Sequence, residues 1–296
     1  MWMPGTRPGM TKERVVRLPA SLLMLVVSCG VTLADAPRRV VSFNLCADQL
    51  VLALADPEQI AGLSPYAADA SVSVMTEKAG AYPRLSWQAE STIALGPDLV
   101  LIGDSDRPVT KHILRAQGLR LHEITLIADL DTARRQVTEV AAVLGHPERG
   151  QKLIAEIEAA RARLHAAPKP HVATALLVNR GGYTAGERSL AGALLAEAGL
   201  KPPAGAPPGY GGYVQLEKLL MLHPDVIVLN DQPGNAADQG SYNLTHPALN
   251  AAYPPARRII LPTRYTLCGG PALVAALDYL TELLTRLAQP PTMRTN

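Results

Sequence analysis

Residues 90–102 read ESTIALGPDLVLI, and residues 217–229 repeat the pattern as EKLLMLHPDVIVL. In each copy a glutamate opens a short amphipathic helix, a Pro-Asp pair ends it, and a four-residue aliphatic run follows. Such a run, preceded by a helix and bounded by proline, is typical of a parallel strand buried on both faces. The copies lie 127 residues apart, which indicates two similar α/β lobes with a ligand cleft between them.

Alternating strand and helix patterns surround the first copy. Short aliphatic runs are separated by segments with helical spacing, and Gly118 closes one of these helices. Alternation of this kind argues for a parallel sheet covered by helices. We expect strands at residues 40–43, 60–63, 99–102 and 121–124, and helices at residues 46–55, 90–95, 108–117 and 131–144.

A longer helix is expected at residues 147–167, where a proline occupies the first turn and Leu153, Ile157 and Leu164 keep helical spacing. At about 1.5 Å per residue it spans roughly 30 Å, the width of a small domain. The second lobe follows this helix. We expect its strands at residues 172–178, 226–229 and 258–261, its helices at residues 189–198, 215–222 and 271–288, and loops at residues 201–213 and 232–241.

These elements predict an α/β protein with two sandwich lobes, each built on a mostly parallel sheet. One long α-helix joins the lobes, and the ligand groove lies between them. We assign residues 37–145 to the N-terminal lobe, 146–170 to the linker helix and 171–296 to the C-terminal lobe, after a leader at residues 1–36.

The leader assignment rests on the first residues of the chain. Lys12, Arg14 and Arg17 precede an apolar run at residues 18–33, which is the pattern of a secretory signal and is short for a membrane span. Cleavage after Ala34 or Ala36 would release a periplasmic protein. A second interpretation of the same segment is lipid anchoring at Cys29, which ends a lipobox-like VVSC stretch.

Charge argues against a nucleic-acid partner. Loss of residues 1–36 removes four of the 28 basic and two of the 26 acidic residues, and leaves 24 of each. A balanced chain offers no long-range attraction for nucleic acid or for an anionic membrane. No later apolar stretch of the sequence is long and uninterrupted enough to cross a bilayer, so we expect a mature protein that is soluble or tethered only by lipid. We also expect a monomer.

The chain resembles the periplasmic substrate-binding proteins of ABC importers for vitamin B12, ferric siderophores and haem. The resemblance covers about residues 38–288 and rests on the opening strand RVVS at residues 39–42, both Glu…Pro-Asp phrases and the single long helix. It implies small closure on the ligand, no catalytic activity and no resident cofactor. It also implies delivery of the cargo to a permease dimer that is driven by an ATPase.

The resemblance assigns a docking role to Glu90 and Glu217. Members of that family carry one glutamate at the tip of each lobe, which engages arginines of the permease, and these two positions match. The alternative is local: a glutamate near a helix start can cap the helix and suits its dipole.

The candidate groove residues follow the predicted strands, because ligands of parallel sheets bind beyond the carboxyl ends of the strands. Seven of the nine tyrosines lie in predicted loops, and loop tyrosines provide contact surface at low entropic cost. Filling of loop gaps is the alternative for these tyrosines. Arginines there can grip a carboxylate or a phosphate, or can be solvated surface residues. The candidates are Asn44, Cys46, Tyr66, Tyr82, Trp87, Arg180, Tyr183, Tyr213, Arg264, Tyr265 and Cys268.

Cys46 and Cys268, one in each lobe, have three interpretations. An oxidising compartment favours a disulfide between the lobes, which requires Cα atoms within about 7 Å. Free thiols could instead contact the ligand or a metal, since each precedes a helix. The third interpretation is two unrelated small apolar side chains.

Neither a bare-metal site nor an enzyme is expected. The seven histidines show no ligand spacing, and nucleophile-elbow, phosphate-loop and dinucleotide motifs are absent from the sequence. We therefore expect the cargo to be a bulky metal chelate or corrinoid, namely a ferric siderophore, cobalamin or haem. The alternative function is a metallocluster- or chelatase-type enzyme on the same bilobal fold, with Cys46 and Cys268 as ligands.

Overall fold

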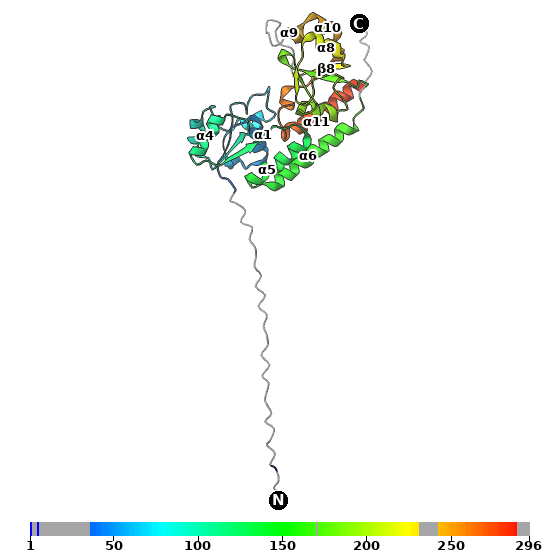
Figure 1. Cartoon of the computed structure of the whole chain (residues 1–296). Coiled ribbons are helices and arrows are strands. Elements are labelled where there is room, and N and C mark those ends of the chain that lie inside the picture. Colours follow the sequence, from blue (N-terminus) through cyan, green and yellow to red (C-terminus); the bar gives the residue numbers. More distant parts are fainter. Residues whose placement is uncertain (2–4, 6–35, 170, 231–241, 289–296) are drawn as a thin grey trace. The chain divides into compact units, whose positions relative to one another are not determined.

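A parallel sheet forms the centre of the N-terminal lobe in the computed structural model (Figure 1), which describes residues 1, 5, 36–169, 171–230 and 242–288. Of the expected leader, only residues 1, 5 and 36 are described, and Cys29 lies outside the described residues. The two central strands are fully buried, as two-sided parallel strands should be, and the edge strands are partly buried. In spatial order the strands of this sheet are β2 (Ile60–Gly62), β1 (Val40–Ser42), β3 (Leu99–Gly103) and β4 (Leu121–Ile124).

Side-chain caps fix where the helices of this lobe begin. The Asn44 side chain accepts hydrogen bonds from the backbone N–H groups of Cys46 and Ala47, and Asp129 accepts one from Thr132. The helices are α1 (Leu45–Leu54), α2 (Thr76–Ala79), α3 (Ala89–Ile93), α4 (Pro108–Ala116) and α5 (Leu130–Leu144).

The C-terminal lobe holds a mixed sheet. Its central strands β5 (Ala175–Val178), β8 (Val226–Leu229) and β9 (Arg258–Ile260) are parallel, and β6 (Tyr183–Ala185) and β7 (Gly211–Tyr213) add an antiparallel edge. This arrangement confirms two α/β lobes with mostly parallel sheets. The helices are α7 (Leu190–Glu197), α8 (Leu216–Leu222), α9 (Tyr242–Thr245), α10 (Pro247–Ala252) and α11 (Pro271–Ala288).

The antiparallel edge corrects the sequence prediction, which placed both segments in loops. Glycine makes the pairing of β6 with β7 possible, because a side chain on Gly211 would lie 2.0 Å from the Thr184 carbonyl oxygen. Gly211 also has φ 110°, which L-residues rarely adopt. Glycine at position 211, within the expected loop, therefore allows the backbones of β6 and β7 to approach closely.

The repeated phrase has the same structure in both lobes. In both copies a residue in the left-handed conformation, Gly96 or His223, stands directly before the Pro-Asp pair. His223 caps α8 directly, whereas α3 ends at Ile93 and two turn residues precede Gly96. The aspartate side chain then accepts hydrogen bonds from the backbone of the segment that enters the neighbouring strand. Asp98 accepts hydrogen bonds from the N–H groups of residues 38 and 39 before β1, and Asp225 accepts from those of residues 173 and 174 before β5.

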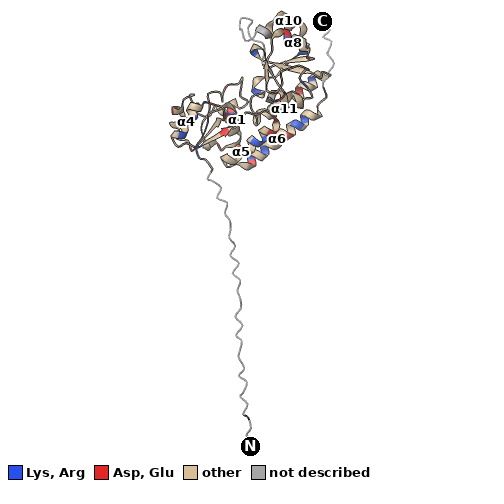
Figure 2. Cartoon of the chain, in the orientation of Figure 1, with Lys and Arg blue, Asp and Glu red and all other residues tan. Residues whose placement is uncertain are grey.

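Helix α6 (Pro147–Ala166) connects the lobes, as predicted. Figure 1 shows it beside α5 at one end and α11 at the other, and Figure 2 shows both signs of charge along it. Ion pairs join α6 to elements of both lobes, and some of them are partly buried. They are Arg134–Glu158 to α5, Arg161–Glu197 to α7 and Arg163–Asp278 to α11.

The segment before α11 packs directly on the N-terminal lobe. A Cβ on Gly269 would lie 3.1 Å from Ala133 Cβ, and one on Gly270 would lie 2.8 Å from Leu50 Cδ2. The two lobes accordingly belong to one compact unit of the chain. Among the described residues, no helix combines the length and the apolar run that crossing a bilayer requires.

We expect Gly270→Ala to lower the free energy of unfolding by about 2–4 kcal/mol. Two effects contribute: an alanine is strained at φ 68°, and its Cβ would clash with the Leu50 side chain. Gly118→Ala is the matched control, since Gly118 has φ 75° and open space around its Cα. It should cost only about 1–2 kcal/mol. Urea denaturation measures both variants, and equal losses would show that the contact between lobes at Leu50 is not tight.

Candidate functional site

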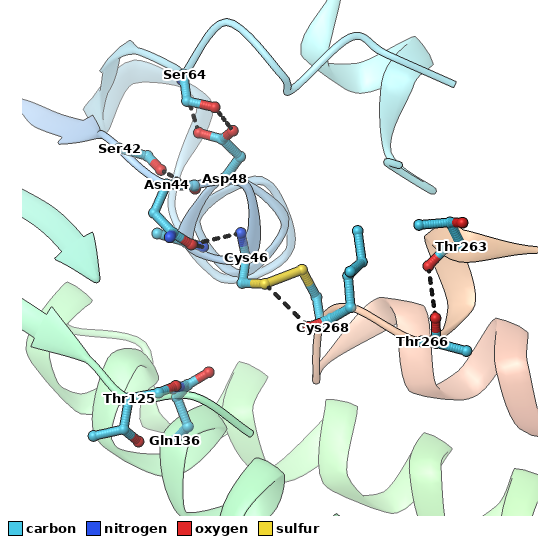
Figure 3. The surroundings of a disulfide bond; sticks show 12 residues. Ser42, Asn44, Cys46, Asp48, Ser64, Thr125, Gln136, Thr263, Thr266 and Cys268 are labelled. Atoms are coloured by element: carbon cyan, nitrogen blue, oxygen red, sulfur yellow. Dashed lines mark hydrogen bonds between the residues drawn. A yellow bond between two sulfur atoms is a disulfide. The ribbon is translucent and has the colours of Figure 1, made fainter. Parts of the chain in front are cut away.

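A disulfide bond joins the two lobes (Figure 3). Cys46, in the first turn of α1, and Cys268, just before α11, are bonded with their Cα atoms 5.1 Å apart. Of the three interpretations of these cysteines, the interlobe disulfide is therefore the correct one. The other two are wrong for this structure, because bonded sulfurs supply no thiolate to a metal or ligand.

The carboxyl edges of the two sheets meet around this bond. Leu126 and Ile127, which follow β4, line a cavity together with C-terminal lobe residues. Arg264, which follows β9, donates a hydrogen bond of 3.4 Å to the carbonyl oxygen of Ala70 in the other lobe. Ligands of parallel sheets bind at such edges, so this cavity is the candidate site.

The cavity has a volume of about 640 Å³, within the usual range for small-molecule sites. Most of its wall belongs to the C-terminal lobe, and much of that wall is apolar. The lining residues are Leu126, Ile127, Leu177, Val178, Asn179, Arg180, Tyr183, Ala185, Ser189, Leu190, Ala191, Tyr210, Asn230, Leu244, Thr263, Thr266 and Leu267.

Two predicted site residues, Arg180 and Tyr183, line this cavity. Tyr183 donates a hydrogen bond of 2.7 Å to the carbonyl oxygen of Tyr210, and Tyr213 stacks edge-on against Tyr183 at a centroid distance of 5.5 Å. Tyr213 itself is 81% exposed and stands outside the cavity wall. It supports the wall through the Tyr183 ring.

The other predicted residues of the C-terminal lobe lie near the cavity without lining it. The Arg264 guanidinium stacks on the Tyr265 ring at 4.9 Å, and Tyr265 packs on the hydrophobic core and against Tyr279. Cys268 is fully buried. For Tyr265 the structure therefore favours the packing alternative over direct contact with a ligand.

Residues predicted from the N-terminal lobe form a separate group outside the cavity wall. Asn44 is engaged as the cap of α1 and donates a hydrogen bond to Asp106, while Tyr82 packs on the core. Tyr66 and Trp87 form a ring pair with centroids 5.1 Å apart. Tyr66 is half exposed, so this ring pair has a free face.

Sequence reasoning missed the apolar and amide part of the wall. It searched for aromatic rings and cations, whereas Leu126 and Leu267 are exposed leucines at the ends of strand-following loops. Asn230 donates a hydrogen bond to Thr266, and its own amide oxygen is buried and has no hydrogen-bond partner among the described residues. Position in the chain could have indicated these residues, because Leu126 follows β4, Asn230 follows β8 and Leu267 follows β9.

Glu90 and Glu217 are exposed, and both lie in the first turn of a helix. Within the described ranges, neither carboxylate accepts a hydrogen bond or joins an ion pair. Neither glutamate therefore makes a capping hydrogen bond, although the first-turn position of both suits the helix dipole. Both carboxylates are available to a partner.

No group of three or more histidine, cysteine, aspartate or glutamate side chains is placed to hold a metal ion in the part of the chain that the structure describes.

Comparison with known families gives a match over most of the chain. The model of the family described as periplasmic binding protein matches residues 40–248. Two curated cobalamin-binding proteins from strains of Halobacterium salinarum are 27% identical over 205 residues, which is 67% of this chain and 55% of each relative. The chain thus spans about half the length of the curated relatives it matches.

Solved structures share the bilobal fold. A periplasmic heme-binding protein from Roseiflexus sp. RS-1 in apo form has a TM-score of 0.68 and 25% identity, covering 85% of this chain and 99% of that chain. The periplasmic vitamin B12 binding protein of Vibrio cholerae has a TM-score of 0.64 and 16% identity, covering 86% and 99%. At such identities the likeness establishes the fold alone.

Asp48 anchors the loop that carries Tyr66. This carboxylate is fully buried on α1 and accepts a hydrogen bond of 2.9 Å from the Ser64 N–H and another from the Ser64 hydroxyl (Figure 3). Burial raises the pKa of Asp48 to about 6, although the hydrogen bonds from serine side chains lower it. The native protein therefore holds this proton at pH values where the unfolded chain has lost it.

We predict that Asp48→Asn changes the pH dependence of stability. With a pKa of about 6 in the native state and about 3.9 in the unfolded state, the Asp48 contribution to stability is greatest below pH 4. It falls as the pH rises to 6, by about 3 kcal/mol in total. Asparagine does not titrate, so the stability of wild type minus that of Asp48→Asn should fall over this window. Urea denaturation from pH 4 to 7 measures it, and parallel profiles would contradict the prediction.

Proposed function

Because the chain belongs to the periplasmic binding protein family, we propose that it is the cargo-binding component of an ABC importer. It holds a bulky metal chelate or corrinoid (haem, cobalamin or a ferric siderophore) in the periplasm and delivers it to a membrane permease. The observation that carries this proposal is the cavity at the facing edges of the two sheets, where Arg180 and Tyr183 stand among leucines of both lobes.

The composition of the cavity wall supports a large, partly apolar cargo. Leu126 and Leu267 come from opposite lobes and remain 73% and 39% exposed. Exposed leucines at a cavity gain stability when an apolar surface covers them. Arg180 adds a cation and Tyr183 an aromatic ring at the same wall, which suits a complex with both an apolar face and acidic groups.

The two alternatives have less support. A bare divalent ion requires several oxygen or nitrogen ligands, and the described residues bring no such group together. The chelatase-type enzyme relied on Cys46 and Cys268, which are bonded to each other.

A panel of cargoes tests the proposal. Hemin, cyanocobalamin, a ferric siderophore and bare zinc or manganese ions are titrated into the protein, with the fluorescence of Trp87 and calorimetry as readouts. We expect one of the metal complexes to bind far more tightly than any bare ion. Tight binding of a bare ion alone would contradict the proposed cargo class.

In the same panel, Leu126→Asp should lower the affinity for the cargo that wild type prefers by about tenfold or more, because burial of a leucine contributes roughly 1.5–3 kcal/mol. Met221→Asp is the matched control, since Met221 on α8 is 71% exposed and lies outside the cavity wall. It should bind like wild type. Equal affinities of the two variants would contradict the proposal that the cargo binds in this cavity.

Docking to the permease is proposed to depend on Glu90 and Glu217. The two carboxylates occupy equivalent positions of the repeated phrase and have no partner among the described residues. Exposed charges of this kind act mainly on association rate and register. Arginines on a twofold-related permease pair would be their complement.

Replacement of both Glu90 and Glu217 by alanine should abolish uptake of cargo while leaving its affinity unchanged, because neither residue lines the cavity. Transport into cells or proteoliposomes and calorimetry measure the two effects separately. Replacement of Glu139 and Glu282, exposed or partly exposed glutamates of α5 and α11, controls for loss of negative charge. A large loss of cargo affinity in the variant that lacks Glu90 and Glu217 would instead indicate that these glutamates belong to the binding site.

A further inference from the structure

Arg107 has an unusual backbone conformation. Its φ and ψ are 39° and 65°, and Arg107 and His223 are the non-glycine residues with positive φ among those described. The left-handed region is unfavourable for a residue with a Cβ. Arg107 also precedes Pro108, and a residue before proline normally adopts an extended conformation. Strain of this kind persists where the surroundings impose it, commonly at functional sites.

The surroundings that impose it are a tight loop after β3. Asp106 folds back over the end of the strand, where a Cβ on Gly103 would lie 2.3 Å from the Asp106 carboxylate. Asp106 also accepts a hydrogen bond of 2.6 Å from the Asn44 side chain. Loop and cap are thereby locked together, and Arg107 is the next residue.

This loop holds the Arg107 guanidinium over aromatic rings. Its central carbon lies 4.3 Å from the centroid of the Trp87 ring and 5.9 Å from that of Phe43. Trp87 in turn stacks with the half-exposed Tyr66. Among the described residues, the guanidinium has no hydrogen-bond or ion-pair partner, although Asp104 and Asp106 are close in sequence. Its N–H donors are oriented by stacking and remain available.

Arg107 lies at the edge of the sheet that contributes to the cavity. The loop follows β3, the neighbour of β4, and Leu126 and Ile127 after β4 line the cavity. Asp106 contacts Asn44, which caps the helix that begins beside the interlobe disulfide. Arg107 does not itself line the cavity, but its loop shares the carboxyl edge of the sheet with the two residues, Leu126 and Ile127, that this lobe contributes to the cavity wall, both of them apolar.

We propose that Arg107, held on Trp87, binds a carboxylate of the cargo from the N-terminal lobe and selects for an anionic metal complex. This inference rests on the proposed function and extends it to a further specificity-determining residue. A planar guanidinium with free donors matches a carboxylate in two-pronged geometry. A metal-bound macrocycle with acidic side chains is the cargo chemistry that this pairing recognises.

The test compares hemin with hemin dimethyl ester, in which both carboxylates are blocked, by calorimetry on the full-length protein. Wild type should prefer hemin, and Arg107→Gln should weaken hemin binding by about tenfold or more while leaving the ester unchanged. Added salt should weaken hemin binding more in wild type than in Arg107→Gln. Arg120→Gln, at the opposite end of the sheet before β4, is the control and should bind both probes like wild type.

Arg107→Gly separates recognition from folding. Glycine tolerates positive φ, so this variant should unfold at no lower temperature than wild type and yet lose the preference for hemin. Wild-type affinities in the Arg107 variants, or equal losses for hemin and its ester, would overturn the assignment of Arg107 alone. A wild type that binds cyanocobalamin but not hemin would overturn the carboxylate assignment and leave the proposed function intact. A wild type that binds no metal complex would overturn both.

Discussion

The contact between the N-terminal end of α11 and the N-terminal lobe is the constraint on which the arrangement of this protein depends. A Cβ on Gly270 would lie 2.8 Å from Leu50 Cδ2, so a side chain there would require Leu50 to shift. The preceding residue, Gly269, packs tightly against Ala133 of α5, where a Cβ would lie 3.1 Å from the Ala133 Cβ. Because α6 also pairs with helices of both lobes, the two sheets are held edge to edge without a hinge of flexible strands. We expect a groove built in this way to be largely formed before a ligand arrives.

The parts of this fold that could be predicted are those in which local sequence decides the structure. The aliphatic run of β8, the proline at the start of α6 and the apolar spacing of α11 each specify one element, and all three lie where expected. The pairing of β6 with β7 was not predictable in this way. Each strand has three residues, and the pairing depends on how closely Gly211 can approach a segment about thirty residues earlier in the chain.

The candidate site was harder to predict than the fold, and for a different reason. Strand order indicated which loops would meet, but not which side chains of those loops would point inward. Tyr82 and Tyr265 were reasonable candidates by type and position, and packing on the core occupies both. Leu126 has no chemical feature that marks it as a site residue, and only its exposure beside a cavity reveals it. Residue type predicts chemistry, whereas burial is decided by long-range contacts.

The disulfide has a consequence for how the chain is made. Cys46 and Cys268 are separated by 222 residues, so the first sulfur is synthesised well before its partner. Because the two cysteines belong to different lobes, the native bond requires the lobes to have met. The third cysteine of the chain, Cys29, lies in the expected leader. A chain without that segment would hold only two cysteines, and its oxidation would offer no incorrect intramolecular pairing.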